Sequence, residues 1–373
     1  MGTLRRRVLR SVLFILCSLL LAEAAARALL WVGPLFRSAQ GTDASSQRIA
    51  WVKRHTRNQT FIYAYDIYDP LRGWAVKPEL HDLVWLSNQS MIVNSNSRGI
   101  RGKTEYSYAR QAGKHRIVTL GDSFTFGDEV SDDETYSYYL TSLLPDTEVL
   151  NLGVHGYGHD QMLLYLKEEG VKYSPDVVIL GYVSLDPPRN LLSFRDFAKP
   201  KFELTKDGLR LTHVPVSTPE SVMAWEPYRP KIFDLVVMAR ERVRSMVGWN
   251  QRRTEAITSA IFDELVKTTR ENGAVPVFVY LPVLQETVNP QEGFTPDEQF
   301  LNQYCQERGM ACLFLRRVFL EQVKKGAKFN TRSHWFASEH MLAAQAIRDF
   351  IYERKLLGAG PSLKDARSTR QPR

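Results

Sequence analysis

The chain has 373 residues, of which 44% are hydrophobic and 24% are charged, and these ordinary globular proportions exclude a largely disordered protein. Its net charge of +8 is concentrated at the two ends, with four arginines among the first ten residues and four basic residues among the last ten. The basic balance therefore indicates membrane topology and a solvated tail, and we expect no nucleic-acid partner.

The N-terminal segment, residues 1–36, places its arginines before an apolar run over residues 11–22, which Glu23 and Arg27 interrupt. The uninterrupted run is shorter than the roughly 20 residues of a spanning helix, but residues 8–32 together are long enough. We favour an uncleaved signal anchor over a cleaved signal peptide. Arginines before such a segment stay in the cytoplasm, so the rest of the chain is expected outside.

A polar and aromatic segment, residues 37–112, follows the anchor. Its prolines and its Ser, Asn and Gly turns show no helical period and predict short strands and loops. Residues 91–102, MIVNSNSRGIRG, predict a strand that runs into a turn.

Residues 113–355 change pattern to short apolar segments that alternate with amphipathic stretches. The apolar segments have the length and composition of buried strands and cover residues 116–120, 148–152, 176–182, 275–281 and 311–315. The amphipathic stretches predict helices over residues 135–144, 160–172, 256–271, 296–308 and 338–355. This alternation predicts a parallel sheet with helices on both faces.

Residues 187–250 interrupt this rhythm with charges, prolines and one predicted helix over residues 231–246. We interpret them as an insertion over the carboxyl edge of the sheet, where substrates bind in such folds. The basic end of the chain, residues 356–373, is a predicted disordered tail.

The chain has three cysteines, of which Cys17 lies in the N-terminal apolar segment. Cys305 and Cys312 lie seven positions apart with no metal-ligand pattern around them. We favour two buried thiols at a helix-to-strand joint, and a disulfide in an oxidising compartment is the alternative.

The sharpest chemical signal is Gly121-Asp-Ser-Phe-Thr-Phe-Gly127, which directly follows the first predicted strand of the sheet. A serine at a strand-to-helix turn is exposed at the carboxyl end of the sheet, where backbone N–H groups stabilise a developing oxyanion. We therefore predict that Ser123 is a nucleophile, against the alternative of a helix N-cap. The loop before the last helix carries His334, which can reach Ser123 as its general base.

The chain resembles the SGNH/GDSL hydrolase superfamily, and in particular a membrane-anchored bacterial branch that carries GDSFTFG. Its four blocks are GDSFTFG, residues 151–158 (NLGVHGYG), residues 181–186 (GYVSLD) and His334-Trp335. The resemblance implies an α/β fold, a flavodoxin-like three-layer sandwich, behind a membrane helix and a small β-rich lead-in. It also places the domain on the periplasmic side of a bacterial inner membrane, held by one spanning helix.

The resemblance implies that Ser123 attacks an ester carbonyl, that His334 is its base and acid, and that Gly156 and the Ser123 amide form the oxyanion hole. Asp122 and Asp186 are further candidates for supporting the site. Leu185 stands where the family has an oxyanion asparagine, and the hydroxyl of Ser184 is our candidate for the missing donor.

The family places a triad aspartate two or three residues before its histidine, where this chain has Arg332 and Thr331. We therefore name no triad acid. The predicted function is ester hydrolysis on O-acyl, chiefly acetyl, groups of envelope carbohydrate or small molecules. The alternatives are an O-acyltransferase and a catalytically inactive domain that binds glycan or scaffolds an assembly. We expect no cofactor and no metal, because the histidines form no ligand pattern.

Overall fold

The computed structural model describes the chain over residues 2–32, 43–86, 90–288, 293–329 and 334–357. The two substitutions at Arg332 and Thr331 and almost all of the predicted C-terminal tail lie outside these residues.

The centre of the molecule is a five-stranded parallel sheet with the strand order β11-β10-β7-β5-β6. Its strands are β5 (His115–Gly121), β6 (Thr147–Gly153), β7 (Val177–Tyr182), β10 (Val275–Tyr280) and β11 (Ala311–Phe314). The chain leaves β5 toward β6 and then returns to pair β7 on the other side of β5. Such a reversal opens a crevice at the carboxyl ends of the strands, so the end of β5 is where a ligand site is expected.

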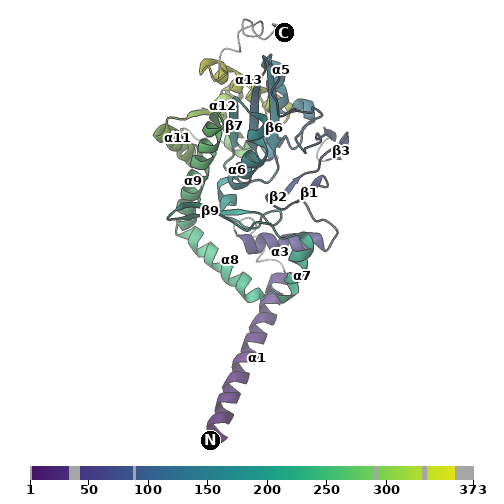
Figure 1. Ribbon diagram of the computed structural model, residues 1–373. Helices are drawn as coiled ribbons and strands as arrows, with labels where there is room; N and C mark the ends of the chain where they lie inside the picture. Colours follow the sequence, from purple (N-terminus) through teal and green to yellow (C-terminus); the bar gives the residue numbers. More distant parts are fainter. Residues whose placement is uncertain (1, 33–42, 87–89, 289–292, 330–333, 358–373) are drawn as a thin grey trace, which may run out of the picture.

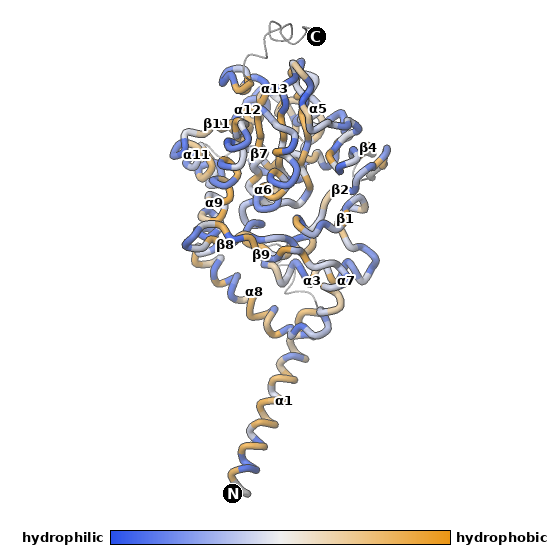
Figure 2. The backbone as a smooth tube through the Cα atoms, in the orientation of Figure 1, coloured by the Kyte–Doolittle hydropathy of each residue, from blue (hydrophilic) through white to orange (hydrophobic). Residues whose placement is uncertain are grey.

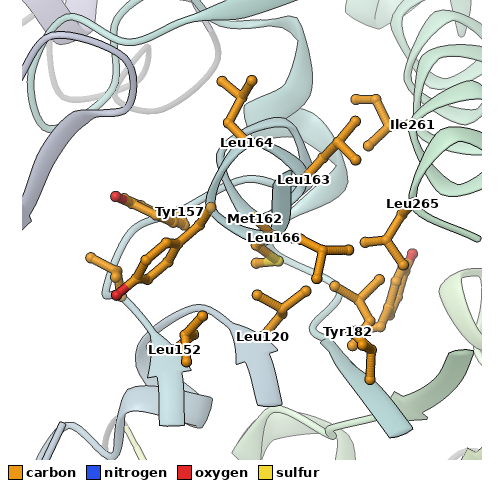
Figure 3. Close-up of a cluster of buried hydrophobic side chains, with 14 of the residues drawn as sticks. Leu120, Leu152, Tyr157, Met162, Leu163, Leu164, Leu166, Tyr182, Ile261 and Leu265 are labelled. Atoms are coloured by element: carbon orange, nitrogen blue, oxygen red, sulfur yellow. The ribbon is translucent and has the colours of Figure 1, made fainter. Parts of the chain in front are cut away.

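Helices cover both faces of the sheet (Figure 1). They are α5 (Tyr136–Leu143), α6 (His159–Glu168), α9 (Trp249–Glu271), α11 (Pro296–Arg308), α12 (Leu315–Lys324) and α13 (Ala337–Glu353). Alternate residues of each strand point to opposite faces. Leu120 and Leu180 thus pack with α6 and α9 in one core, and Ile179 and Val279 pack with α5 and α13 in the other. Figure 3 shows the first core, in which Met162 and Leu166 of α6 lie toward Leu120 of the sheet and Leu163 lies toward Ile261 of α9. The predicted three-layer α/β fold is confirmed.

The lead-in segment carries two small antiparallel sheets, as the turn-rich sequence predicts. Their strands are β1 (Asp66–Asp69), β2 (Gly73–Val76), β3 (Leu83–Leu86) and β4 (Ser90–Val93). The segment also contains a helix that the sequence reading missed, α3 (Ala44–His55), which Asp43 caps by accepting a hydrogen bond from the Ser46 amide. Its buried side includes Trp51, which packs on Phe197 of the insertion, so tertiary contacts stabilise a helix whose own apolar period is weak.

The insertion begins with the short η3 (Pro187–Leu191), followed by the hairpin of β8 (Lys201–Thr205) and β9 (Gly208–Thr212). It continues through α7 (Pro219–Trp225) and the short η4 (Glu226–Tyr228) to α8 (Lys231–Met246). The predicted helix over residues 231–246 coincides with α8. α8 lies at the end of the body from which the N-terminal helix α1 (Gly2–Val32) projects (Figure 1).

Helix α1 stands apart from the body over most of its length, and hydrophobic residues predominate along it (Figure 2). Its segment Leu4–Leu30 contains an 18-residue window with a mean hydropathy of 2.1, of which 6% is buried, and the helix is long and apolar enough to cross a membrane. A signal sequence meets the same criterion.

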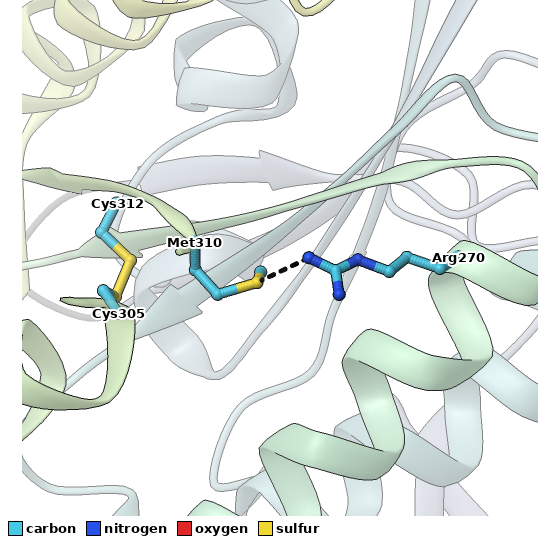
Figure 4. Close-up of a disulfide and its surroundings, with 4 residues drawn as sticks. All are labelled: Arg270, Cys305, Met310 and Cys312. Carbon is cyan, nitrogen blue, oxygen red and sulfur yellow. Dashed lines mark hydrogen bonds between the residues drawn. A yellow bond between two sulfur atoms is a disulfide. The ribbon is translucent and has the colours of Figure 1, made fainter. Parts of the chain in front are cut away.

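Cys305 and Cys312 form a disulfide between the end of α11 and β11 (Figure 4). The preference for two buried thiols is therefore wrong. α11 ends at Gly309 in the left-handed conformation, and this tight turn leaves the two cysteine Cα atoms 6.4 Å apart, within reach of a disulfide. Beside it, the Arg270 guanidinium donates to the sulfur of Met310.

Candidate active site

Ser123 is the first residue of α4 (Ser123–Phe126), directly after β5. The preceding Asp122 caps this turn, since its carboxylate accepts a hydrogen bond of 3.0 Å from the Phe124 amide. Gly121 permits the sharp turn, because a Cβ there would lie 2.0 Å from the Thr125 hydroxyl oxygen. The amide of the first residue in a helix has no acceptor within that helix, so the Ser123 N–H is available to an oxyanion.

His334 reaches Ser123 from the segment before α13, and its Nε2 lies 2.9 Å from the serine Oγ. Neighbouring contacts hold the imidazole in place. The Phe124 ring centroid is 5.1 Å from that of His334, and the indole of Trp335 donates a 3.0 Å hydrogen bond to the Pro282 carbonyl. The structure therefore brings together the two residues that the sequence nominates as nucleophile and base.

The other imidazole nitrogen of His334 faces Glu129, with Nδ1 and the carboxylate Oε1 separated by 3.8 Å. Glu129 is buried and takes a left-handed backbone conformation with φ of 71°. A non-glycine residue in this region is strained, and such strain concentrates at functional sites. Sequence reasoning missed Glu129 because it sought the acid beside the histidine, whereas this carboxylate follows the nucleophile block at its Gly127 turn.

The protonation of His334 reflects this acidic surrounding. Burial lowers the pKa of His334, but the neighbouring carboxylates of Glu129 and Asp128 outweigh burial and hold the pKa above its usual value. Asp128 lies 4.0 Å from Nε2, on the serine side of the ring, and accepts a hydrogen bond of 2.5 Å from the Tyr63 hydroxyl. The site thus favours the imidazolium that forms when the histidine takes a proton from the serine.

Of the positions predicted for the oxyanion hole, Gly156 shares the cleft with Ser123 and Ser184 does not. Gly156 lines the same cleft as Ser123 and has φ of 73°, and a Cβ there would lie 2.4 Å from the Asp196 carboxylate, so the position requires glycine. Leu185 also lines this cleft, and its side chain is 53% exposed. The Ser184 hydroxyl instead donates 2.9 Å to Glu286 and lines a second cavity, so it does not replace the missing asparagine.

A buried ion cluster connects the two sides. The Arg189 guanidinium donates to Asp122 at 3.1 Å, to Asp186 at 2.6 Å and to the Tyr157 carbonyl at 2.8 Å. Burial and the charge of Asp122 raise the pKa of Asp186 well above its usual value, although the charge of Arg189 opposes this shift. Asp122 and Asp186 therefore support the site through Arg189, and neither approaches the imidazole as a triad acid does.

The cleft over Ser123 has a volume of about 330 Å³. Its lining combines the catalytic pair with polar and aromatic side chains, among them Tyr63, His155, Arg195 and Gln285. His155 forms a buried pair with Asp66, and the Nε2–carboxylate distance is 2.7 Å. Burial lowers the pKa of His155, but the charge of Asp66 raises it overall. This pair supports the cleft wall behind Gly156.

The sheet order, the serine at the carboxyl end of β5 and the histidine before the last helix coincide with the arrangement that the sequence resemblance implies. The chain has the flavodoxin-like three-layer α/β arrangement. Within this fold, the GDSFTFG, NLGVHGYG and His334-Trp335 blocks bring Ser123, Gly156 and His334 to one cleft.

No protein-family model and no curated protein matches the chain. Among solved structures, a two-domain esterase active on acetylated mannans is similar over 67% of this chain, with 12% identity and a TM-score of 0.40, and the chain spans only 52% of that protein. A lipolytic G-D-S-L family protein from Veillonella parvula gives 9% identity and a TM-score of 0.39 over 64% of this chain and 97% of the other. A mutant acetyl-xylooligosaccharide esterase from Geobacillus gives 17% identity and a TM-score of 0.37 over 64% and 95%.

Proposed function

We propose that the protein is a serine ester hydrolase of the SGNH type. The observation that carries this proposal is the hydrogen bond of 2.9 Å between the Ser123 Oγ and the His334 Nε2, at the carboxyl end of a parallel sheet and inside a cleft. Glu129 at the far side of the imidazole supports it further, because an acid in that position fixes the ring and stabilises its protonated form.

In the proposed reaction, His334 accepts the hydroxyl proton as the Ser123 oxygen attacks the ester carbonyl carbon. The amides of Ser123 and Gly156 donate to the oxyanion of the tetrahedral intermediate. The C–O bond to the alcohol then breaks, and His334 returns the proton to that leaving oxygen. Water then attacks the acyl-serine carbonyl and gives one proton to His334. The bond between the acyl carbon and the Ser123 Oγ breaks, His334 returns the proton to that oxygen, and the carboxylic acid and the free serine are released.

We propose O-acylated carbohydrate, with a small acyl group such as acetyl, as the substrate class. A cleft of about 330 Å³ suits a short acyl group better than a long chain. Polar side chains such as Arg195 and Gln285 at its wall offer hydrogen bonds to sugar hydroxyls. We also propose that α1 anchors the protein in a bacterial inner membrane with the catalytic domain in the periplasm, where it would meet envelope carbohydrate.

Two alternatives share this site. An O-acyltransferase would form the same acyl-serine and differ only in using a sugar hydroxyl in place of water. An inactive scaffold would not need the strained, buried Glu129 beside His334, so the geometry favours an enzyme over a scaffold.

The test is hydrolysis of p-nitrophenyl acetate and of an acetylated oligosaccharide by the purified full chain, beside Ser123→Ala and His334→Ala. We expect both substitutions to lower kcat by about 10⁴- to 10⁶-fold, as in other serine hydrolases, while Ser184→Ala retains activity as the matched serine control. Equal turnover in the parent and Ser123→Ala proteins would overturn the proposal. Acyl-serine accumulation with slow release, accelerated by added sugar, would identify the transferase.

A further inference from the structure

Large apolar side chains lie exposed along α7, η4, α8 and the start of α9, and we call this surface the α8 face. Its members are each at least half exposed and are Trp225, Tyr228, Phe233, Val236, Val243, Met246, Val247 and Trp249. Within α8, Phe233, Val236, Val243 and Met246 follow one another at intervals of three, seven and three residues, which places them on one side of the helix.

The other side of α8 is firmly attached to the body. Asp234 is fully buried and forms ion pairs with Arg48 of α3 and with Arg229, whose Nε lies 3.0 Å away. Leu235 and Met238 pack against the cluster that Leu30 of α1 forms with α3. The α8 face is therefore a fixed surface of a packed helix.

The α8 face begins where α1 leaves the body. The Glu23 carboxylate of α1 accepts hydrogen bonds from the amides of Lys231 at 2.9 Å and Ile232 at 3.1 Å, so it caps the N-terminus of α8. One turn later, the Arg27 guanidinium donates to the Pro227 carbonyl at 3.2 Å. These bonds join the apolar N-terminal helix to the first residues of the face, and α8 extends obliquely away from that junction (Figure 1).

The chemistry of the α8 face matches a membrane surface. Trp225 and Tyr228 lie at the α1 end of the face and Trp249 at its other end, and these two residue types concentrate at lipid–water interfaces. Arg240 and Arg242 of α8 are exposed basic residues, and Arg240 also pairs with Glu241 and lines the second cavity. An amphipathic helix with aromatic and aliphatic residues on one side and arginines beside them binds anionic lipid headgroups.

We propose that the α8 face lies on the membrane into which α1 inserts, with its apolar side chains in the interface and its arginines at anionic headgroups. This inference rests on the proposed anchorage by α1. Val237 and Glu241 of α8 also line the second cavity, about 890 Å³ in volume, which shares Leu185 with the catalytic cleft. A membrane-bound α8 would therefore fix the orientation of this cavity and of the cleft relative to the bilayer.

The experiment uses the full chain in nanodiscs of phosphatidylcholine and phosphatidylglycerol. An environment-sensitive fluorophore is attached, one site at a time, at Phe233→Cys, Val243→Cys and Met246→Cys in a Cys17→Ser background. Tyr352→Cys is the matched control, because Tyr352 is a similarly exposed aromatic residue on α13, at the far end of the molecule from α1. Quenching by a spin-labelled lipid is compared with quenching by aqueous iodide.

We expect the spin-labelled lipid to quench the three α8 labels and iodide to quench the Tyr352 label. Iodide quenching at all four positions would overturn the inference. A label on the native Cys17, which is exposed on α1, separates this failure from a failure of the anchorage. Lipid quenching at Cys17 together with iodide quenching at the α8 labels would support the anchorage by α1 and refute the membrane-bound α8 face. Iodide quenching at Cys17 would refute both.

Discussion

The two sides of the catalytic cleft differ in how their polar groups are supplied. The nucleophile side is built from side chains of one short segment, with Ser123, Asp128 and Glu129 all within seven residues and all buried. The oxyanion side depends on backbone amides near Gly156 and presents the apolar, half-exposed Leu185 where a donor is expected. Charge around the histidine is thus concentrated, while stabilisation of the oxyanion is sparse.

This difference indicates which step of the proposed catalysis the cleft supports better, proton transfer or stabilisation of the oxyanion. Proton transfer between serine and histidine benefits from the acidic surrounding that raises the pKa of His334. In the proposed mechanism, the amides of Ser123 and Gly156 stabilise the tetrahedral intermediate, and Leu185 adds no donor to them.

Among the substitutions considered, replacing Glu129 on the nucleophile side should lower the activity most. We expect Glu129→Gln to lower kcat by about 10²- to 10⁴-fold, because the imidazole loses the acid that fixes its tautomer. Glu129 raises the pKa of His334, so its loss should lower that pKa and move the acid limb of the kcat/KM profile to lower pH. The pH–rate profile measures both effects. Asp133→Asn, an exposed carboxylate nearby, should change neither, and an unshifted limb in Glu129→Gln would refute the positioning role.

Arg189 connects the two sides of the cleft by pairing with both Asp122 and Asp186. Replacing it should leave these two buried carboxylates without their shared cation. We expect Arg189→Met to reduce the free energy of unfolding by about 3–5 kcal/mol, measured by urea denaturation. The charge of Arg189 lowers the pKa of Asp186, so its loss should raise that pKa further in the folded variant. The folded variant then gains more stability from protonation than the parent protein does, and the deficit should shrink as pH falls. Arg210→Met on the exposed β8–β9 hairpin is the control, and an equal loss there would contradict the cluster's role.

Adding a hydrogen-bond donor on the oxyanion side should change kcat least. We expect Leu185→Asn to raise kcat by about 10- to 100-fold, below the roughly 10²–10³-fold that a pre-organised donor contributes. Leu185→Ala removes the leucine without adding a donor and should show no such gain. A Leu185→Asn protein no faster than Leu185→Ala would mean that the backbone amides already saturate the oxyanion.

Much of the fold is predictable because its strands are apolar on both faces and its helices are amphipathic over long stretches. The five strands and α8 lie where the sequence pattern predicts them. α3 is not predictable in this way, because its stability comes from packing Trp51 against residues more than a hundred positions away.

The proposed nucleophile and base could be predicted from the sequence, because each lies in a recognisable block at the boundary of a helix or strand. Glu129 was not, because its approach to His334 depends on the left-handed turns after α4 and on a loop 200 residues later. The misassigned role of Ser184 has a similar cause, since its partner Glu286 lies about a hundred positions away.

The bonds between Glu23 and α8 set the depth at which the anchored protein would sit. Because Glu23 is held against the body, the hydrocarbon-spanning part of α1 is limited to the apolar residues between Arg10 and Glu23. Twelve helical residues span about 18 Å, well short of the roughly 30 Å of a bilayer core. Such hydrophobic mismatch is relieved by thinning the bilayer and by arginines that reach toward the headgroups. In the proposed anchored state, the short span would hold the body against the membrane surface, with α8 as the helix nearest to the lipid.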